Sequence, residues 1–198
     1  FWDPEHGGTY WMLDGSGRPL SDRKQTYALA FSLYGLVEYH RATGSAEALE
    51  RAKALHRAIE THASDPVHGG YGEARARDWS PLADVRLSEK DLNAPKSMNT
   101  HLHVMEAYAS LLRAWPDPGL RERLRAVVAL HLDRILDPAT GHLVLFFDER
   151  WAPLSRTVSY GHDIEASWLL VEAAEAAGDR ALLERAKAAA VRMARVTL

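Results

Sequence analysis

Two segments, each centred on a histidine, hold the side chains best suited to chemistry. Asn99 and His103 are four residues apart, and His162 and Glu165 are three residues apart. On a helix, residues at either spacing lie on one face. Histidine ordinarily titrates near neutrality, so it can take or give a proton at physiological pH. A histidine with a polar neighbour one turn away therefore predicts acid–base chemistry in each segment.

His101 and His103 flank a single residue, and this spacing would suit a metal site if the segment were a strand. On a helix the two side chains point roughly 200° apart, so only one of them can face a given pocket. The pattern here is helical, and we expect no metal. A lone histidine on a buried helix is often only a hydrogen-bonded core residue. Asn99 on the same face and the parallel segment at His162 favour a catalytic role for His103.

His162 stands at the expected start of a helix, directly after a glycine. Asp163 suits the positive end of the helix dipole and is expected to serve as the cap. The same dipole disfavours an imidazolium, so His162 should be neutral and able to act as a general base. Glu165, one turn further, is placed to orient the imidazole and to stabilise its protonated form.

Composition narrows the class of protein. The 198 residues are 46% hydrophobic and 26% charged, which fits one globular domain with a sizeable core. The net charge of −3 gives no electrostatic reason to expect binding to nucleic acid or to an anionic membrane. No cysteine is present, which excludes disulfides and thiolate zinc sites. No apolar run approaches the roughly 20 residues that a membrane helix needs.

Three segments with a shared pattern organise the chain. They start at Asp3, Asp65 and Asp137, and each begins with Asp-Pro, passes through a glycine-containing turn and ends on a Pro-Leu pair. Each segment predicts a short hairpin; in the first, 9–12 would face 14–17, and in the third, 143–147 would face 148–149. Self-similarity of this kind indicates a repeat architecture.

Two helices are expected after each hairpin. Apolar residues at helical spacing and glycine stops place them at about 22–42, 45–63, 99–115, 118–136, 162–177 and 180–198. Helix pairs joined by short β-hairpins on one rim are typical of an all-α toroid. Residues 1–198 are therefore predicted to form a single domain that is about half of an (α/α)6 barrel. The chain starts without methionine and stops inside an amphipathic pattern, so we expect the middle portion of a longer protein, truncated at both ends.

A charged stretch between Ser80 and Met98 interrupts this rhythm. Loops of such length in compact domains are commonly the wall or lid of a pocket. Asp91 within it is a candidate for hydrogen bonds to a sugar hydroxyl, and a solvated loop charge is an equally good interpretation. Tryptophan side chains in or beside the hairpins suit stacking on sugar rings, although for any one of them a core position is favoured.

Three stretches of the chain, residues 1–8, 96–103 and 160–165, resemble the N-acylglucosamine 2-epimerase superfamily. The resemblance implies an (α/α)6 barrel whose bore binds a reducing sugar and which uses neither a redox cofactor nor a catalytic metal. It is strongest to members that epimerise C2 of the reducing-end sugar of β-1,4-linked disaccharides, converting cellobiose to glucosyl-mannose.

The resemblance also implies roles for individual residues. In the superfamily one histidine removes the C2 proton of the ring-opened sugar to give a cis-enediol(ate), and a second returns a proton to the other face. His162 matches one of these two, and the other lies beyond this chain, as does an arginine of the family's first helices. His103 matches a further histidine associated with ring opening and polarisation of O1 and C2. Asn99 would bind the substrate, Tyr27 would lie near the sugar, and Glu165 would support His162.

The expected partner is therefore a small-molecule sugar, such as cellobiose or lactose, bound by a cytoplasmic monomer or weak homodimer. A mannose-type aldose–ketose isomerase or an N-acylglucosamine 2-epimerase is the nearest alternative. A glycoside hydrolase would need two carboxylates across the bore, for which Asp91 and Glu165 are the only candidates. A non-catalytic sugar-binding toroid is a further alternative, and it predicts that His162→Ala changes nothing measurable.

Overall fold

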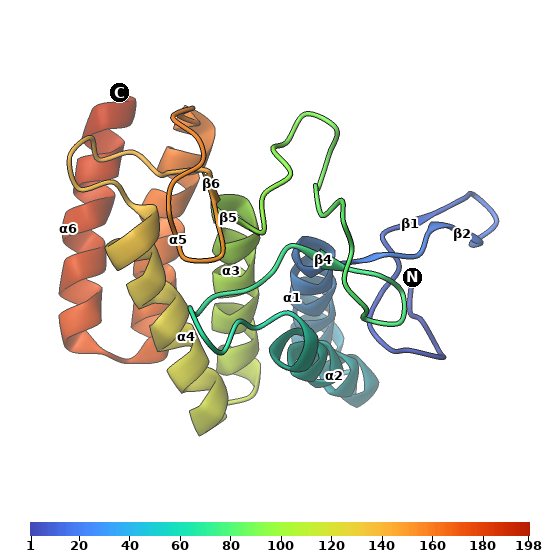
Figure 1. Ribbon diagram of the computed structural model, residues 1–198. Coiled ribbons are helices and arrows are strands. Elements are labelled where there is room, and N and C mark those ends of the chain that lie inside the picture. The colour runs from blue at the N-terminus through green and yellow to red at the C-terminus, as the bar shows by residue number, and fades with distance from the viewer.

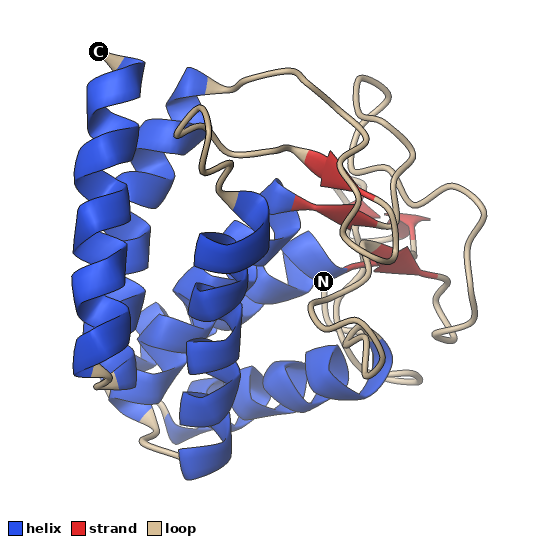
Figure 2. Cartoon of the chain, turned by 60° about the vertical axis from the view of Figure 1, so that its left-hand side comes forward, coloured by secondary structure: helices blue, strands red, loops and turns tan.

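The computed structural model describes residues 1–198 as three helix pairs with short strands gathered at one end (Figure 1, Figure 2). The helices are α1 (Thr26–Thr43), α2 (Ala46–His62), α3 (Met98–Ala114), α4 (Pro118–Leu130), α5 (Tyr160–Ala177) and α6 (Arg180–Thr197), and α4 continues into a π-helical turn, η1 (His131–Ile135). The strands are β1 (Met12–Leu13), β2 (Pro19–Ser21), β3 (Lys24–Gln25), β4 (Ala74–Arg75), β5 (Lys96–Ser97) and β6 (Phe146–Phe147). The prediction of three helix pairs is confirmed.

Local sequence explains where most helices begin and end. Ser45, Asp117 and Asp179 each accept a hydrogen bond from a backbone N–H of the first turn, which caps α2, α4 and α6. Gly44 and Gly178 end α1 and α5 in the left-handed conformation, at φ 73° and 69°. These signals act within a few residues of the helix end, and the sequence-based bounds are correct there to within a few residues.

Helices α1, α3 and α5 lie side by side in one row, and α2, α4 and α6 pack against one side of that row (Figure 1). A single hydrophobic cluster of 37 buried residues runs through all three pairs. Helix α3, in the middle of the row, is buried over most of its length. The opposite side of the row is open, and a small hollow there is lined by residues of α1, α3 and α5 alone. This arrangement of helix pairs is that of an α/α toroid.

Strand pairing differs from the predicted local hairpins. In the first repeat the pairing is β1 with β2, and these strands start three and five residues later than expected. Strand β6 pairs with β5 of the preceding repeat rather than with residues 148–149, and within its own repeat it meets the chain again at the Phe147–Pro153 bridge. Strand β3 pairs in the same way with β4 of the following repeat. The backbone just before α1 and α3 needs hydrogen-bond partners, and the next repeat provides them. For this reason α1 begins at Thr26 instead of residue 22.

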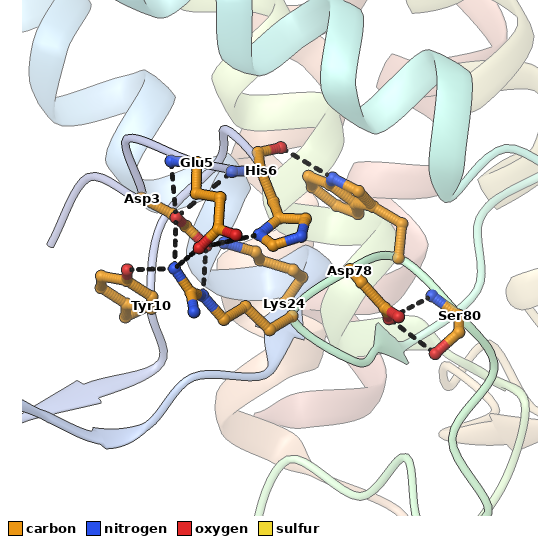
Figure 3. Close-up of polar contacts among 9 residues, drawn as sticks. Asp3, Glu5, His6, Tyr10, Lys24, Asp78 and Ser80 are labelled. Carbon is orange, nitrogen blue, oxygen red and sulfur yellow. Dashed lines mark hydrogen bonds and ion pairs between the residues drawn. The ribbon is translucent and has the colours of Figure 1, made fainter.

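An ion cluster joins the first two repeats (Figure 3). Asp3 is fully buried, and its carboxylate accepts hydrogen bonds from Lys24 Nζ at 2.8 Å and from Arg77 Nε at 3.0 Å. Burial opposes ionisation, but the hydrogen bonds from Arg77 and Lys24 hold the pKa of Asp3 well below its usual range. The indole of Trp79 donates to the carbonyl oxygen of His6 at 2.9 Å.

The second and third repeats are joined in nearly the same way. Lys96 Nζ donates to Asp65 Oδ2 at 2.7 Å, and Trp151 Nε1 donates to the carbonyl oxygen of His68 at 2.9 Å. Gly70 has a φ of 78°, and a Cβ there would lie 2.5 Å from the Trp151 ring, so only glycine fits. Trp79 and Trp151 are therefore held inside the repeat junctions. The structure also has no helix that is long and apolar enough to span a membrane.

Candidate active site

A cavity of about 300 Å³ opens at the N-terminal ends of α3 and α5. Its walls are the loop at 85–94, the first turn of α3, strand β6 and the residues that lead into α5. Three of the residues singled out from the sequence line it: Asp91, Asn99 and His162. The long loop thus forms a wall of the cavity, as its length suggested.

Asn99 lines this cavity and carries a buried acceptor without a partner. Its side chain is half-buried, and its Oδ1 atom is buried without a hydrogen-bond donor in the chain. Leaving a buried acceptor unpaired costs roughly 1–3 kcal/mol. A bound molecule that donates a hydroxyl hydrogen to Oδ1 would remove this cost, so the cavity is suited to a polyhydroxylated ligand.

The ring of His162 is held by Ser159. The Nδ1 atom lies 2.7 Å from Ser159 Oγ, and Nε2 has no partner within the chain. No hydrogen bond joins His162 to Glu165, and the hydrogen-bond partner of the His162 ring within the chain is Ser159, three residues upstream. Asp163 also differs from expectation. It does not cap α5 but is fully buried, accepting from Leu143 N at 2.9 Å and facing His142 Nδ1 at 2.7 Å.

His103 lies on the open side of the helix row, outside the cavity walls. Its ring packs against Tyr27 and Phe31 of α1, with ring centroids 5.1 and 4.4 Å away. Its Nδ1 atom lies 2.9 Å from Glu106 Oε2 on the next turn of α3. A carboxylate on one ring nitrogen is the usual arrangement for a histidine whose other nitrogen works on a ligand.

His101 is unlike its neighbour. It is fully buried, with Nδ1 2.7 Å from the carbonyl oxygen of Ser97, and its Nε2 accepts from Tyr71 N at 2.9 Å. Burial lowers its pKa to about 3, so the ring is neutral at physiological pH. His101 therefore serves as a backbone acceptor within the fold, and the two histidines point to different surroundings, as a helix requires.

Tyr27 on α1 and Glu165 on α5 interact through charge. Burial raises the pKa of the Tyr27 phenol, and the negative charges of Glu165 and Glu106 raise it further. The charge of Glu165 thus reaches Tyr27, and no hydrogen bond joins Glu165 to His162. The predicted residues form two neighbouring groups, one in the cavity and one on the open face of the helices. Their roles stay predictions.

Glu73 is a cavity residue that sequence reasoning missed. Its carboxylate accepts from Ser97 N at 2.7 Å, from Ser97 Oγ at 3.0 Å and from Thr100 Oγ1 at 2.7 Å. Burial raises its pKa to about 7, even though these hydrogen bonds oppose the shift. Comparison of the repeats could have found it, because the corresponding positions hold Trp11 and Leu145, and a charge replaces an apolar residue there.

The sequence raised two other kinds of site, a pair of hydrolase carboxylates and a metal site. Asp91 accepts from the backbone and hydroxyl of Ser88, which fixes a turn of the loop, and Glu165 is not among the residues that line the cavity. The two carboxylates expected of a hydrolase thus do not share a cavity. No three histidine, aspartate or glutamate side chains are grouped closely enough to hold a metal ion.

Known proteins are similar to this chain in sequence and in fold. The family model described as N-acylglucosamine 2-epimerase matches residues 1–197. The cellobiose 2-epimerase of Bacteroides fragilis is 52% identical over 183 residues, covering 92% of this chain and 47% of that protein. The chain thus spans about half the length of the curated relatives it matches.

Solved structures agree with this. The cellobiose 2-epimerase from Bacillus thermoamylovorans superimposes with a TM-score of 0.92 at 38% identity, over 98% of this chain and 50% of that one. A family 76 glycoside hydrolase from Bacteroides thetaiotaomicron superimposes with a TM-score of 0.68 at 13% identity, over 90% of this chain and 46% of that one. The second likeness concerns the fold alone. Together they confirm the toroid, of which this chain covers about half.

Proposed function

Because this chain belongs to the N-acylglucosamine 2-epimerase family, we propose that the full-length protein is a carbohydrate 2-epimerase. Its proposed substrate is the reducing-end sugar of a β-1,4-linked disaccharide such as cellobiose. The observation that carries the proposal is the 52% identity, over 92% of the chain, to a cellobiose 2-epimerase. The cavity with its unpaired Asn99 acceptor and its half-buried histidine supports it.

The proposed chemistry begins at C2 of the ring-opened sugar. A proton next to an aldehyde is weakly acidic, so its removal needs a base that is neutral near pH 7 and donors for the developing enediolate oxygen. His162 is the proposed base, acting through Nε2, which has no partner in the chain. The product of this step is a planar cis-enediol(ate), and the C2 proton resides on His162.

Inversion is completed when a proton reaches C2 from the opposite face. His162 is the only histidine that lines the cavity, so the proposal assigns this second transfer to a group outside residues 1–198. The net reaction inverts one carbon and changes no oxidation state, so the mechanism as proposed uses no redox cofactor.

The cluster on the open face is proposed to act on the sugar before C2 chemistry. His103, with Glu106 on its Nδ1 atom, would assist ring opening and polarise O1 and C2. Tyr27 stands beside it and would contact the sugar ring. Asn99, on the same face of α3 one turn earlier, would accept a hydroxyl hydrogen.

The test uses the full-length protein incubated with cellobiose in D2O, with the reducing-end C2 proton followed by NMR. We expect this signal to disappear while resonances of a mannose-type reducing end grow in. His162→Gln should lower the exchange rate by about 10²- to 10⁴-fold, the range for loss of a general base. His68→Gln, at an exposed turn, is the matched control and should exchange at the wild-type rate.

Other outcomes would replace the proposal. A ketose product would indicate an aldose–ketose isomerase. Free glucose with an intact C2 signal would indicate a glycoside hydrolase. Wild-type exchange in the His162→Gln variant would remove His162 from the mechanism while leaving the family assignment in place.

A further inference from the structure

Two serines stand directly before helices of the row, one before α3 and one before α5, but their hydroxyls make different hydrogen bonds. Ser97 precedes α3, and its Oγ accepts a hydrogen bond from Thr100 N at 3.1 Å, an ordinary N-cap. Ser159 precedes α5 and makes no such cap. Its hydroxyl lies instead 2.7 Å from Nδ1 of His162. The serine before α5 therefore holds the imidazole and leaves the helix uncapped.

The hydrogen atoms of this pair allow two arrangements. In one, the Ser159 hydroxyl donates to Nδ1 of His162, and the neutral ring carries its proton on Nε2. Nε2 is then a donor and cannot act as a base. In the other, Nδ1–H donates to Ser159 Oγ, and Nε2 has a free lone pair. Only the second arrangement suits a general base at Nε2.

The second arrangement frees the hydroxyl hydrogen of Ser159. Within the chain this hydroxyl has no partner other than His162. Among the groups of the chain, the bond that satisfies the hydroxyl is therefore the one to Nδ1, which produces the inactive tautomer. Ser159 lines the same cavity as Asn99 and His162, so a bound molecule can offer it an acceptor.

A sugar has the matching chemistry for this part of the cavity. Each hydroxyl both donates and accepts, and the unpaired Oδ1 of Asn99 requires a donor while the freed Ser159 hydroxyl requires an acceptor. A cis-diol, or a hydroxyl beside a carbonyl, presents both functions on adjacent carbons.

We propose that Ser159 is a positioning residue that couples sugar binding to the tautomer of His162. A sugar oxygen that accepts the Ser159 hydroxyl hydrogen makes Nδ1–H the donor to Oγ and leaves Nε2 as the base. The ring loses a hydrogen at Nε2 and gains one at Nδ1 by exchange with solvent, so its charge does not change. The assignment rests on the proposed function, in which His162 removes the C2 proton.

The absence of an N-cap makes Ser159 a clean position to test. Replacing an N-cap serine by alanine ordinarily costs about 0.5–2 kcal/mol of stability. Ser159 makes no cap bond, so Ser159→Ala should leave the melting temperature unchanged. The Oγ atom of Ser45 accepts a hydrogen bond from Ala48 N and caps α2. Ser45→Ala is therefore the same substitution at a serine that does cap a helix, and it should lower the melting temperature. A loss of function at Ser159 without a loss of stability would separate positioning from folding.

The experiment measures the tautomer of His162 by ¹⁵N NMR in the full-length protein, with the ring signals assigned through His162→Gln. Adding cellobiose should move wild-type His162 to the Nδ1–H tautomer, and Ser159→Ala should not respond. The same variant should lose about tenfold in the kcat of C2 exchange, the effect of one hydrogen bond, with little change in KM. Ser159→Thr should restore the response, and Ser45→Ala should lower the melting temperature while leaving tautomer and kcat unchanged.

The tautomer of His162 and the rate of C2 exchange together distinguish the proposed role of Ser159 from the proposed epimerase function. If wild type exchanges C2 and Ser159→Ala keeps both the tautomer response and the rate, the inference is wrong and the epimerase proposal stands. If wild type does not exchange C2 but cellobiose shifts the tautomer only when Ser159 is present, the coupling stands and the epimerase proposal is wrong. If cellobiose leaves the wild-type tautomer unchanged, the coupling is wrong whatever the rate.

Discussion

The junction between the first two repeats and the cavity at α3 and α5 treat buried polar groups in opposite ways. At the junction, the Asp3 carboxylate accepts from two backbone N–H groups, from Lys24 and twice from Arg77. In the cavity, Asn99 Oδ1 has no donor. The Asp3 carboxylate, which supports the fold, is thus satisfied within the chain, whereas Asn99 Oδ1 in the cavity is not.

The largest expected effect is a loss of stability when the junction between the first two repeats is broken. Asp3→Asn removes the charge that Lys24 and Arg77 share and leaves the fully buried Lys24 ammonium without its carboxylate. Loss of one partner of a buried ion pair destabilises by about 3–5 kcal/mol. Urea unfolding of the full-length protein should show a loss of this size, and the kcat of the molecules that remain folded should be unchanged.

Asp78 provides the matched control for that substitution. It is an exposed aspartate near the same junction, bonded only to Ser80, and Asp78→Asn should have little effect on unfolding (Figure 3). Equal losses for both variants would mean that the buried pair has no special weight. A fall in kcat at full folding would mean that the junction also shapes the site.

A smaller effect is expected at Glu73 in the cavity, where the free energy of unfolding should depend on pH. In the unfolded chain Glu73 ionises with the ordinary glutamate pKa of 4.5, whereas in the folded protein its pKa is about 7. Between these values the unfolded state loses the proton first, so Glu73 makes the protein less stable as pH rises. Relative to Glu73→Gln, wild type should therefore lose about 2–3 kcal/mol of unfolding free energy between pH 5 and pH 8.

Unfolding curves in urea at the two pH values measure this difference. Glu89→Gln, an exposed glutamate in the neighbouring loop, is the control and should follow wild type. A gap between wild type and Glu73→Gln that stays constant with pH would show that Glu73 is already ionised at pH 5.

The smallest expected change in stability lies at Asn99. Asn99→Ala removes an acceptor that has no donor, so unfolding free energy should stay within about 0.5 kcal/mol of wild type. The KM for cellobiose should rise by about tenfold, the value of one hydrogen bond from a sugar hydroxyl. Melting curves together with initial rates check both parts. A large loss of stability with an unchanged KM would place Asn99 with Asp3 as a structural group.

Much of the fold was predictable because its signals are local. Helix periodicity, the caps at Asp117 and Asp179, and the stops at Gly44 and Gly178 act over a few residues. The strand pairing was not predictable in this way. Lys96 pairs with Phe147 across 51 residues, and nothing near either residue in the chain specifies that partner.

The candidate site shows the same difference between local signals and contacts that depend on packing. Asn99 and His162 were found because residue type and helical spacing already suggest chemistry, and the structure places both in one cavity. Glu165 was assigned to His162 because both lie on one helix, but no hydrogen bond joins the two, and the charge of Glu165 acts on Tyr27 of α1. Ser159 was overlooked because a serine before a helix ordinarily predicts a cap.

The sequence by itself determined three helix pairs, their bounds, the repeat and the two histidine segments, since these depend on interactions between residues a few positions apart. Only the tertiary structure decided which side chains meet. The partners of Glu73, and the pairing of β3 with β4 and of β5 with β6 across repeats, follow from how the repeats pack side by side. Such contacts join residues distant in the chain, and their energies depend on burial, which the linear pattern does not contain.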